Sequence, residues 1–256
     1  MMKKLAIYTC ITGGYDPLIQ PVAVVPWCDF ICFVPEGEER KGSDGVWQLR
    51  SFSGFHGSPA AMSRYPKMHP TELLPEYEYS LWIDGNVGIA SAGFYDVLAG
   101  LMDQGVLYAG IPHPGRDCAY EEAAACVRGG KSGLRPMLAA VGTLSAAGLP
   151  RHAGLWENNV ILRRHSDAAV AALNRRWWEL YLGCGRDQLV LPLCLREAGI
   201  TPVPLLPSGE SARNSAFLSY RYHDRPEDGR FFHKKWRGLG RSLSNLVMSL
   251  RLRSVR

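Results

Sequence analysis

The chain alternates short apolar runs, rich in β-branched and aromatic residues, with longer segments that are helical by composition. Short apolar runs bounded by turn signals predict buried strands. Because the predicted strands and helices alternate, the sequence predicts one α/β domain, a three-layer sandwich around a mostly parallel central sheet. We expect strands at residues 5–11, 29–34, 46–52, 79–83, 106–111, 155–162 and 203–206.

Two helix starts carry their own signals. Ser58-Pro59 places a capping side chain before a proline, which suits a helix that carries Arg64 and ends near Pro66 or Pro70. Ser166-Asp167 supplies caps for a long helix. One predicted helix starts at 58–59, and the others span 93–102, 120–127, 134–147, 167–182 and 187–198.

The strand at 79–83 ends in Asp84-Gly85-Asn86, a carboxylate, a glycine and an amide. In open α/β sheets, ligands bind at the carboxyl ends of strands. Asp84 can hold a divalent metal there, and Gly85 allows a ligand close to the backbone. The alternative is that Asp84-Gly85 makes an ordinary turn. After the first strand, Thr12-Gly13-Gly14-Tyr15 forms a Gly-rich loop that can present N–H groups to a nucleotide, although it matches no dinucleotide or P-loop motif.

The composition is that of a soluble globular protein, with 46% hydrophobic and 21% charged residues in 256. No apolar run reaches the roughly 18 to 20 residues of a membrane span. The start resembles a signal peptide, but its apolar run is short and breaks at Gly13-Gly14, so we interpret it as a strand. Seven scattered cysteines without C-x-x-C spacing favour free thiols in a reducing cytoplasm over disulfides or structural zinc.

Positive charge is concentrated at the end of the sequence. Residues 229–256 hold eight Lys or Arg and no Asp or Glu, so residues 1–228 hold 21 basic and 24 acidic side chains, a net charge of −3. We therefore divide the chain into a domain at 1–228 and a basic tail at 229–256. The tail predicts a helix with an apolar stripe of Leu239, Leu243, Leu246, Val247 and Leu250. An apolar stripe flanked only by basic residues is typical of a helix that lies on an anionic membrane, which would here be the inner face of the cell membrane. The alternative is a helix docked on the acidic body.

Five stretches match, in order, the blocks of one family: Tyr8–Asp16, Ser63–Pro70, Leu81–Asn86, His113–Ala123 and Trp156–Asn159. The chain resembles the domain family long catalogued as of unknown function, whose plant members are regarded as Golgi hexosyltransferases. The resemblance runs from residue 5 to about residue 200. More distantly, the pattern is similar to retaining glycosyltransferases of the glycogenin and bacterial lipopolysaccharide galactosyltransferase kind. The resemblance implies a GT-A-like fold and hexose transfer from a nucleotide sugar, UDP-linked, to a saccharide or glycolipid acceptor in cell-surface glycan synthesis.

The resemblance also implies roles for residues. A divalent cation, Mn²⁺ or Mg²⁺, together with Lys or Arg would stabilise the departing diphosphate. The implied catalytic residues are Asp84, Asp187 and Gln188. The implied donor-binding residues are Thr9, Thr12, Gly13, Tyr15, Arg64, Lys67, Asn86, Asn158, Asn159 and Lys235, with Tyr15 placed to stack on the base. Arg64 and Lys67 would meet the diphosphate or help fix Asp84. The candidate acceptor-binding residues are Arg116, Asp117, Glu121 and Glu157, and the implied metal ligands are Asp84, Asn86 and His233. Glu122 could bind an acceptor with the first three of these, and the alternative for all four is that they are helix-start charges that suit the helix dipole.

The chain departs from the distant relatives at the second position of their Asp-x-Asp motif, which is Asn86. An amide oxygen ligates a metal more weakly than a carboxylate, so metal dependence stays open. His233, followed by Lys234, Lys235 and Trp236, best matches their late histidine, with His223 as a rival and an ordinary histidine as the alternative for each. Retention is implied by the relatives, yet no carboxylate is clearly placed as a nucleophile, so covalent and same-face mechanisms both remain.

Other classes of function fit less well. The acidic body carries no nucleic-acid-binding module, and the sequence lacks the G-x-S-x-G of serine hydrolases and the H-E-x-x-H of metalloproteases. The remaining rival to an enzyme is a non-catalytic protein that binds a nucleotide sugar or glycan with a degenerate metal site.

Overall fold

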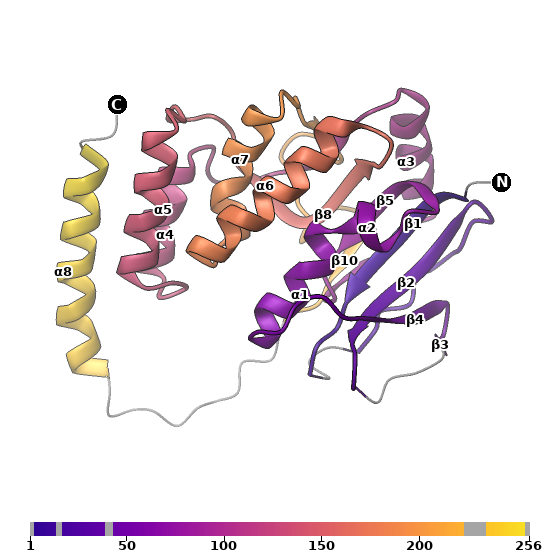
Figure 1. Cartoon of the computed structure of the whole chain (residues 1–256), viewed down its shortest axis with the longest axis horizontal. Helices are drawn as coiled ribbons and strands as arrows, with labels where there is room; N and C mark the ends of the chain where they lie inside the picture. Colours follow the sequence, from indigo (N-terminus) through magenta and orange to yellow (C-terminus); the bar gives the residue numbers. More distant parts are fainter. Residues whose placement is uncertain (1–2, 14–16, 39–42, 223–233, 254–256) are drawn as a thin grey trace.

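The structure, a computed structural model, describes residues 3–13, 17–38, 43–222 and 234–253, except for the side chains of residue 3 and residues 234–243. Strands and helices alternate through most of these residues (Figure 1). The strands are β1 (Lys3–Cys10), β2 (Cys28–Pro35), β3 (Ser43–Asp44), β4 (Trp47–Phe52), β5 (Tyr77–Ile83), β6 (Val87–Ile89), β7 (Tyr108–Pro112), β8 (Trp156–Arg164), β9 (Val203–Pro204) and β10 (Leu218–Tyr220). The helices are α1 (Pro59–Met68), α2 (Pro70–Leu73), α3 (Gly93–Asp103), α4 (Ala119–Arg128), α5 (Leu134–Ala146), α6 (Ala168–Cys184), α7 (Asp187–Glu197) and α8 (Lys234–Arg253).

The central sheet has the order β3-β4-β2-β1-β5-β8-β7-β9. Strands β4, β2, β1 and β5 run parallel to one another, while β8 runs antiparallel to both β5 and β7. A second, two-stranded sheet pairs β6 with β10. The expected α/β fold with a mostly parallel sheet is therefore confirmed, and within this sheet β8 runs opposite to both of its neighbours.

Alternate side chains of each central strand enter different cores. In β1, Ala6 and Tyr8 join the core beneath α1 and α4–α7, whereas Leu5 and Ile7 join the core beneath α3. This follows from the two-residue repeat of a strand, and it explains why these strands are apolar throughout their length. Helices thus cover both faces of the sheet and complete the three-layer sandwich.

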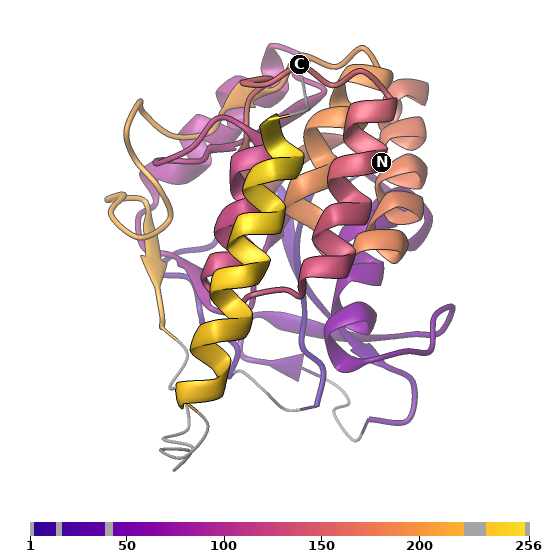
Figure 2. The ribbon, with the colours of Figure 1, turned by 90° about the vertical axis from the view of Figure 1, so that its left-hand side faces the viewer.

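The last helix, α8, packs against α4 and α5 at the end of the molecule away from β2 and β4 (Figures 1 and 2). Met248 is buried in the contact, and Arg151 donates to the carbonyl of Leu252 at 3.4 Å. Leu246 and Leu250 of the expected stripe instead remain more than half exposed. Among the described residues, no helix combines the length and apolar content that a membrane span requires.

Candidate active site

The carboxyl end of β5 meets the amino end of β8, because the two strands are antiparallel. Ile83 pairs with Val160, and the Asp84 N–H donates to the carbonyl of Asn159 at 2.8 Å. The strand pairing alone therefore brings the Asp84 stretch beside the two asparagines of β8.

A β-bulge turns the asparagines out of the regular ladder. Along β7 the pairing runs from Gly110 with Ile161 directly to Ile111 with Glu157, so Asn158 and Asn159 have no counterpart on β7. Bulges of this kind redirect side chains beside active sites. Here both amides line a cavity.

Two helix ends supply the charged residues opposite β5. Helix α1 has Ser58 as its N-cap, as predicted: the Ser58 hydroxyl accepts from the Ala61 N–H at 3.2 Å, and the last turns of the helix carry Arg64 and Lys67. Helix α6 ends at Gly185, which has a left-handed φ of 66° that glycine adopts without strain. This turn starts α7 at Asp187, so the carboxylate faces α1.

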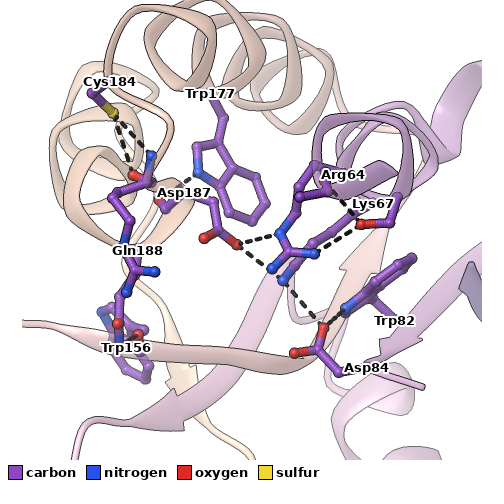
Figure 3. Close-up of polar contacts among 12 residues, drawn as sticks. Arg64, Lys67, Trp82, Asp84, Trp156, Trp177, Cys184, Asp187 and Gln188 are labelled. Atoms are coloured by element: carbon purple, nitrogen blue, oxygen red, sulfur yellow. Dashed lines mark hydrogen bonds and ion pairs between the residues drawn. The ribbon is translucent and has the colours of Figure 1, made fainter. Parts of the chain in front are cut away.

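Lys67 joins the two carboxylates. Its Nζ lies 3.3 Å from Asp84 Oδ1 and 3.0 Å from Asp187 Oδ2, and Arg64 Nε lies 3.6 Å from the same Asp187 oxygen (Figure 3). Trp82 donates to Asp84 Oδ1 at 2.7 Å. The Lys67 side chain is 1% exposed, so these contacts replace its hydration almost completely.

The charge balance keeps Asp187 ionised. Burial alone would raise the pKa of Asp187, but the charges of Lys67 and Arg64 outweigh burial and hold the pKa well below its usual range. Asp187 is therefore a fixed anion at neutral pH, committed to its two cations.

Arg163, a fully buried residue of β8, fixes the end of α1. It donates at 2.6 Å to both the Lys67 carbonyl and the Tyr8 hydroxyl, and at 2.8 Å to Asn174. A planar guanidinium suits several simultaneous acceptors. Arg163 thus positions Lys67 through its backbone without itself reaching the cavities.

Two adjoining cavities, of about 490 and 360 Å³, meet at Arg64 and Asp84. The first has a larger apolar share and the second is mostly polar. The first is also lined by Cys10, Ile11, Thr12, Ser58, Pro59, Ala60, Ser63, Trp82, Gly85 and Asn86. The second is also lined by Lys67, His113, Pro114, Glu122, Lys131, Glu157, Asn158, Asn159, Arg186, Asp187, Gln188 and Arg213.

The structure brings many of the predicted site residues to these cavities. Thr12 and Asn86 line the first cavity, while Lys67, Glu157, Asn158, Asn159, Asp187 and Gln188 line the second. Gln188 donates to the Trp156 carbonyl at 2.8 Å, which fixes the start of β8 against α7. Arg116 contacts Glu122 at 2.6 Å, next to the second cavity.

Other predicted residues lie elsewhere. Thr9 is buried in β1, and the Gly13 N–H donates to Glu38 at 2.9 Å. Asp117 and Glu121 contact His152 at 2.7 and 3.9 Å on the surface, away from both cavities. Tyr15, His223, His233 and the side chain of Lys235 lie outside the described residues.

Five residues of the second cavity were not assigned from the sequence: His113, Pro114, Lys131, Arg186 and Arg213. Glu122, which was a candidate for binding the acceptor, also lines this cavity. Arg186 stands directly before Asp187-Gln188, and His113 and Pro114 begin the block at 113–123, so these three had a signal. Arg213 lies 56 residues after Glu157 in the chain and pairs with it, and no local sequence pattern indicates this contact.

The family model for the "TOD1/MUCI70, glycosyltransferase-like domain" matches residues 2–197. The chain belongs to this family. No curated protein matches the chain significantly. The match covers all five blocks identified in the sequence, so the expected resemblance is confirmed. Membership of the TOD1/MUCI70 family supports a glycosyltransferase function in general.

Two of the three expected metal ligands, Asp84 and Asn86, line the first cavity, and the third, His233, lies outside the described residues. The Asn86 Nδ2 donates to the Arg221 carbonyl at 3.1 Å, which leaves the Asn86 amide oxygen without a partner among the described residues. Asp84 Oδ2 has no partner among them either, because Lys67 and Trp82 both contact Asp84 Oδ1. Two such oxygens suit Mg²⁺ or Mn²⁺. A separate surface group of Cys118, Glu121 and His152 has ligand atoms within 4.8 Å of one another.

Proposed function

We propose that the protein transfers a hexose from a nucleotide-diphosphate sugar, UDP-linked, to a saccharide or glycolipid acceptor in cell-surface glycan synthesis, with retention of configuration. The observation that carries the proposal is the position of Asp84, at the boundary between a partly apolar cavity and a polar one, beside Arg64 and Lys67.

The two cavities suit the two parts of the donor. Cys10, Ile11 and Trp82 offer apolar surface for the nucleoside, and the second cavity offers amides and charges for sugars. The diphosphate then lies at the shared wall, where Arg64 offsets the charge that develops on departure. Asp84 and Asn86 would hold a divalent cation, which adds positive charge to the same leaving group.

The paired carboxylates favour a same-face mechanism over a covalent one. Asp187 is held by Lys67 and Arg64, and Glu157 by Arg213. A carboxylate committed to a buried ion pair is a poor nucleophile, because attack would leave its cation unpaired. The departing diphosphate can instead direct the acceptor to the face that it leaves.

Calorimetry with UDP and GDP, with and without Mn²⁺, followed by hydrolysis assays on a panel of sugar donors, tests the proposal. We expect UDP to bind and one UDP-sugar to be turned over. Asp84→Asn should lower turnover at least about a hundredfold. Asp103→Asn, an exposed carboxylate paired with Lys4, is the matched control and should keep full turnover.

The same experiment separates the rival class. Nucleotide binding without hydrolysis or transfer of any donor would favour a non-catalytic binding protein. Full turnover in Asp84→Asn would remove Asp84 from the mechanism.

We further propose that the tail places the enzyme on the anionic inner face of the cell membrane, in the cytoplasm, near a glycolipid acceptor. Leu246 and Leu250 are 57% and 55% exposed on α8, although this helix is docked. The tail has eight basic and no acidic residues, each basic one worth on the order of 1 kcal/mol at an anionic surface.

Co-sedimentation with vesicles tests the tail. The protein should sediment with anionic but not neutral vesicles, and high salt should release it. Leu246→Ser with Leu250→Ser should weaken sedimentation, whereas Leu182→Ser, an equally exposed leucine of α6, should not. Equal sedimentation of both variants and the parent protein would exclude a membrane role for this face.

A further inference from the structure

The carboxylates of the second cavity are already neutralised. Each forms an ion pair within the protein, and Asp84, which also lines the first cavity, keeps a second oxygen for the proposed divalent cation. Lys67 pairs with Asp84 and Asp187, Arg116 with Glu122, and Arg213 with Glu157.

Two cations of the same cavity have no such partner. Among the described residues, neither Lys131 nor Arg186 has a carboxylate within ion-pair distance, and the buried Nε of Arg186 has no hydrogen-bond partner. Burial raises the pKa of the Cys126 thiol, and the charges of Arg186 and Lys131 both oppose that rise. Both cations line this cavity and lie within electrostatic range of the same thiol.

Unpaired amide atoms lie in the same wall. Asn158 is 7% exposed, yet neither its Oδ1 nor its Nδ2 has a partner among the described residues, and Asn159 Oδ1 has none. Buried polar atoms are rarely left unpaired, because each costs desolvation without a bond in return. Asn158 offers a donor and an acceptor together, which suits sugar hydroxyls.

The backbone adds a positive end. Helix α7 has 11 residues and begins at Asp187 in the cavity wall, with Arg186 as its N-cap. The N-terminus of such a helix favours anions. The cations, the unpaired amides and the first residue of this helix all line the same cavity.

We propose that the second cavity binds a sugar carrying an anionic group, a carboxylate or a phosphate, held by Lys131 and Arg186 while Asn158 binds its hydroxyls. This inference rests on the proposed function for the identity of the reaction, but the anionic-sugar site is tested separately. The donor diphosphate lies instead at the wall shared by both cavities, at Arg64 and Asp84, since neither Lys131 nor Arg186 lines the first cavity. The anionic group can belong to the donor sugar or to the acceptor.

Calorimetry in two arms distinguishes these sources. The donor arm compares UDP-glucuronate with UDP-glucose, and the acceptor arm compares glucuronate and glucose 6-phosphate with glucose in the presence of UDP. The variants are Lys131→Gln with Arg186→Gln, and the control is Arg135→Gln, an exposed arginine of α5 outside both cavities.

We expect the anionic member of one arm to bind at least tenfold more tightly than its neutral counterpart, and the double variant to lose that preference. Binding of UDP alone should stay unchanged in the double variant, and Arg135→Gln should behave as the parent. Preference in the donor arm assigns the charge to the donor sugar, and preference in the acceptor arm assigns it to the acceptor.

Two results would overturn the inference. The first is that neither arm shows a preference for the anionic sugar. The second is that the double variant loses as much affinity for UDP as for the anionic sugars, which would assign both cations to the diphosphate. Failure of UDP to bind the parent protein would instead refute the proposed function. In that case, binding of glucuronate or glucose 6-phosphate that depends on Lys131 and Arg186 would still support the site.

Discussion

Lys67 has almost no contact with water, yet its ammonium group meets carboxylates from two distant parts of the chain. A buried cation of this kind stabilises a fold only when its partners stay ionised and its position is fixed. Asp187 provides the ionised partner, and Arg163 fixes the backbone of Lys67. The site geometry is therefore set by charges that are satisfied before any substrate arrives.

The first prediction concerns how the stabilising effect of Asp187 depends on pH. The folded-state pKa of Asp187 lies below its unfolded value of about 3.9, so its ion pairs stabilise the fold above that pH and are lost as pH falls through the folded pKa. Asp187→Asn should therefore be less stable than the parent at pH 7, by on the order of 2 kcal/mol, and this gap should narrow as pH falls from about 5 to 3.

Denaturant unfolding at several pH values measures the gap. Asp103→Asn, whose side chain is 70% exposed, is the control and should stay within about 0.5 kcal/mol of the parent throughout. A gap for Asp187→Asn that does not change with pH would mean that Asp187 is not held as an ionised partner of Lys67.

At the scale of elements, the long strands and helices were predictable because each carries an apolar pattern and turn or cap signals at its ends. The short strands β6 and β10 were not predicted, since three residues are too few to show a period. The reversal of β8 was also not predicted, because strand direction depends on how the chain returns across the sheet. That reversal and its bulge place Asn158 and Asn159 beside Asp84. The same limit applies to Arg213, which only the folded chain brings to Glu157.

The second prediction tests the small β6–β10 sheet. A Cβ at Gly88 would lie 2.5 Å from Ile19 Cγ2 and 2.7 Å from Ser219 Oγ, so Gly88→Ala should push β6 away from its neighbours at a cost of about 1 to 3 kcal/mol. Asn86 donates a hydrogen bond to the Arg221 carbonyl at the end of this sheet, and it lines the first cavity. A shift of β6 should therefore also weaken the binding of UDP.

Gly142→Ala provides a control of opposite sign. A Cβ at Gly142, inside α5, meets nothing within 4 Å, so alanine should stabilise the protein by about 0.5 to 1 kcal/mol. Thermal unfolding and UDP calorimetry measure both variants. Unchanged stability in Gly88→Ala would show that the two-stranded sheet yields easily and does not hold Asn86 rigidly.

At the scale of the whole molecule, the family match ends at residue 197, and α8 lies beyond it. This helix has two different faces: Met248 is buried against the helical layer, and Leu246 and Leu250 point to solvent. A helix attached through one apolar contact surface can open as a unit while the rest of the domain stays folded. The buried face of α8 can therefore be altered without changing its exposed face.

The last prediction separates the two faces. Met248→Ala removes most of a buried side chain and should weaken the docking of α8 by about 2 kcal/mol. Hydrogen exchange should then rise in α8 and in the surfaces of α4 and α5 that it covers, while β1 and β5 stay protected. Leu250→Ala, on the exposed face of the same helix, should leave exchange unchanged.

If α8 binds anionic vesicles, its release in Met248→Ala should strengthen sedimentation, because the freed inner face adds apolar area to the membrane contact. Increased exchange throughout the sheet would instead show that α8 is part of the cooperative core, and that the tail at 229–256 is not separable from the domain.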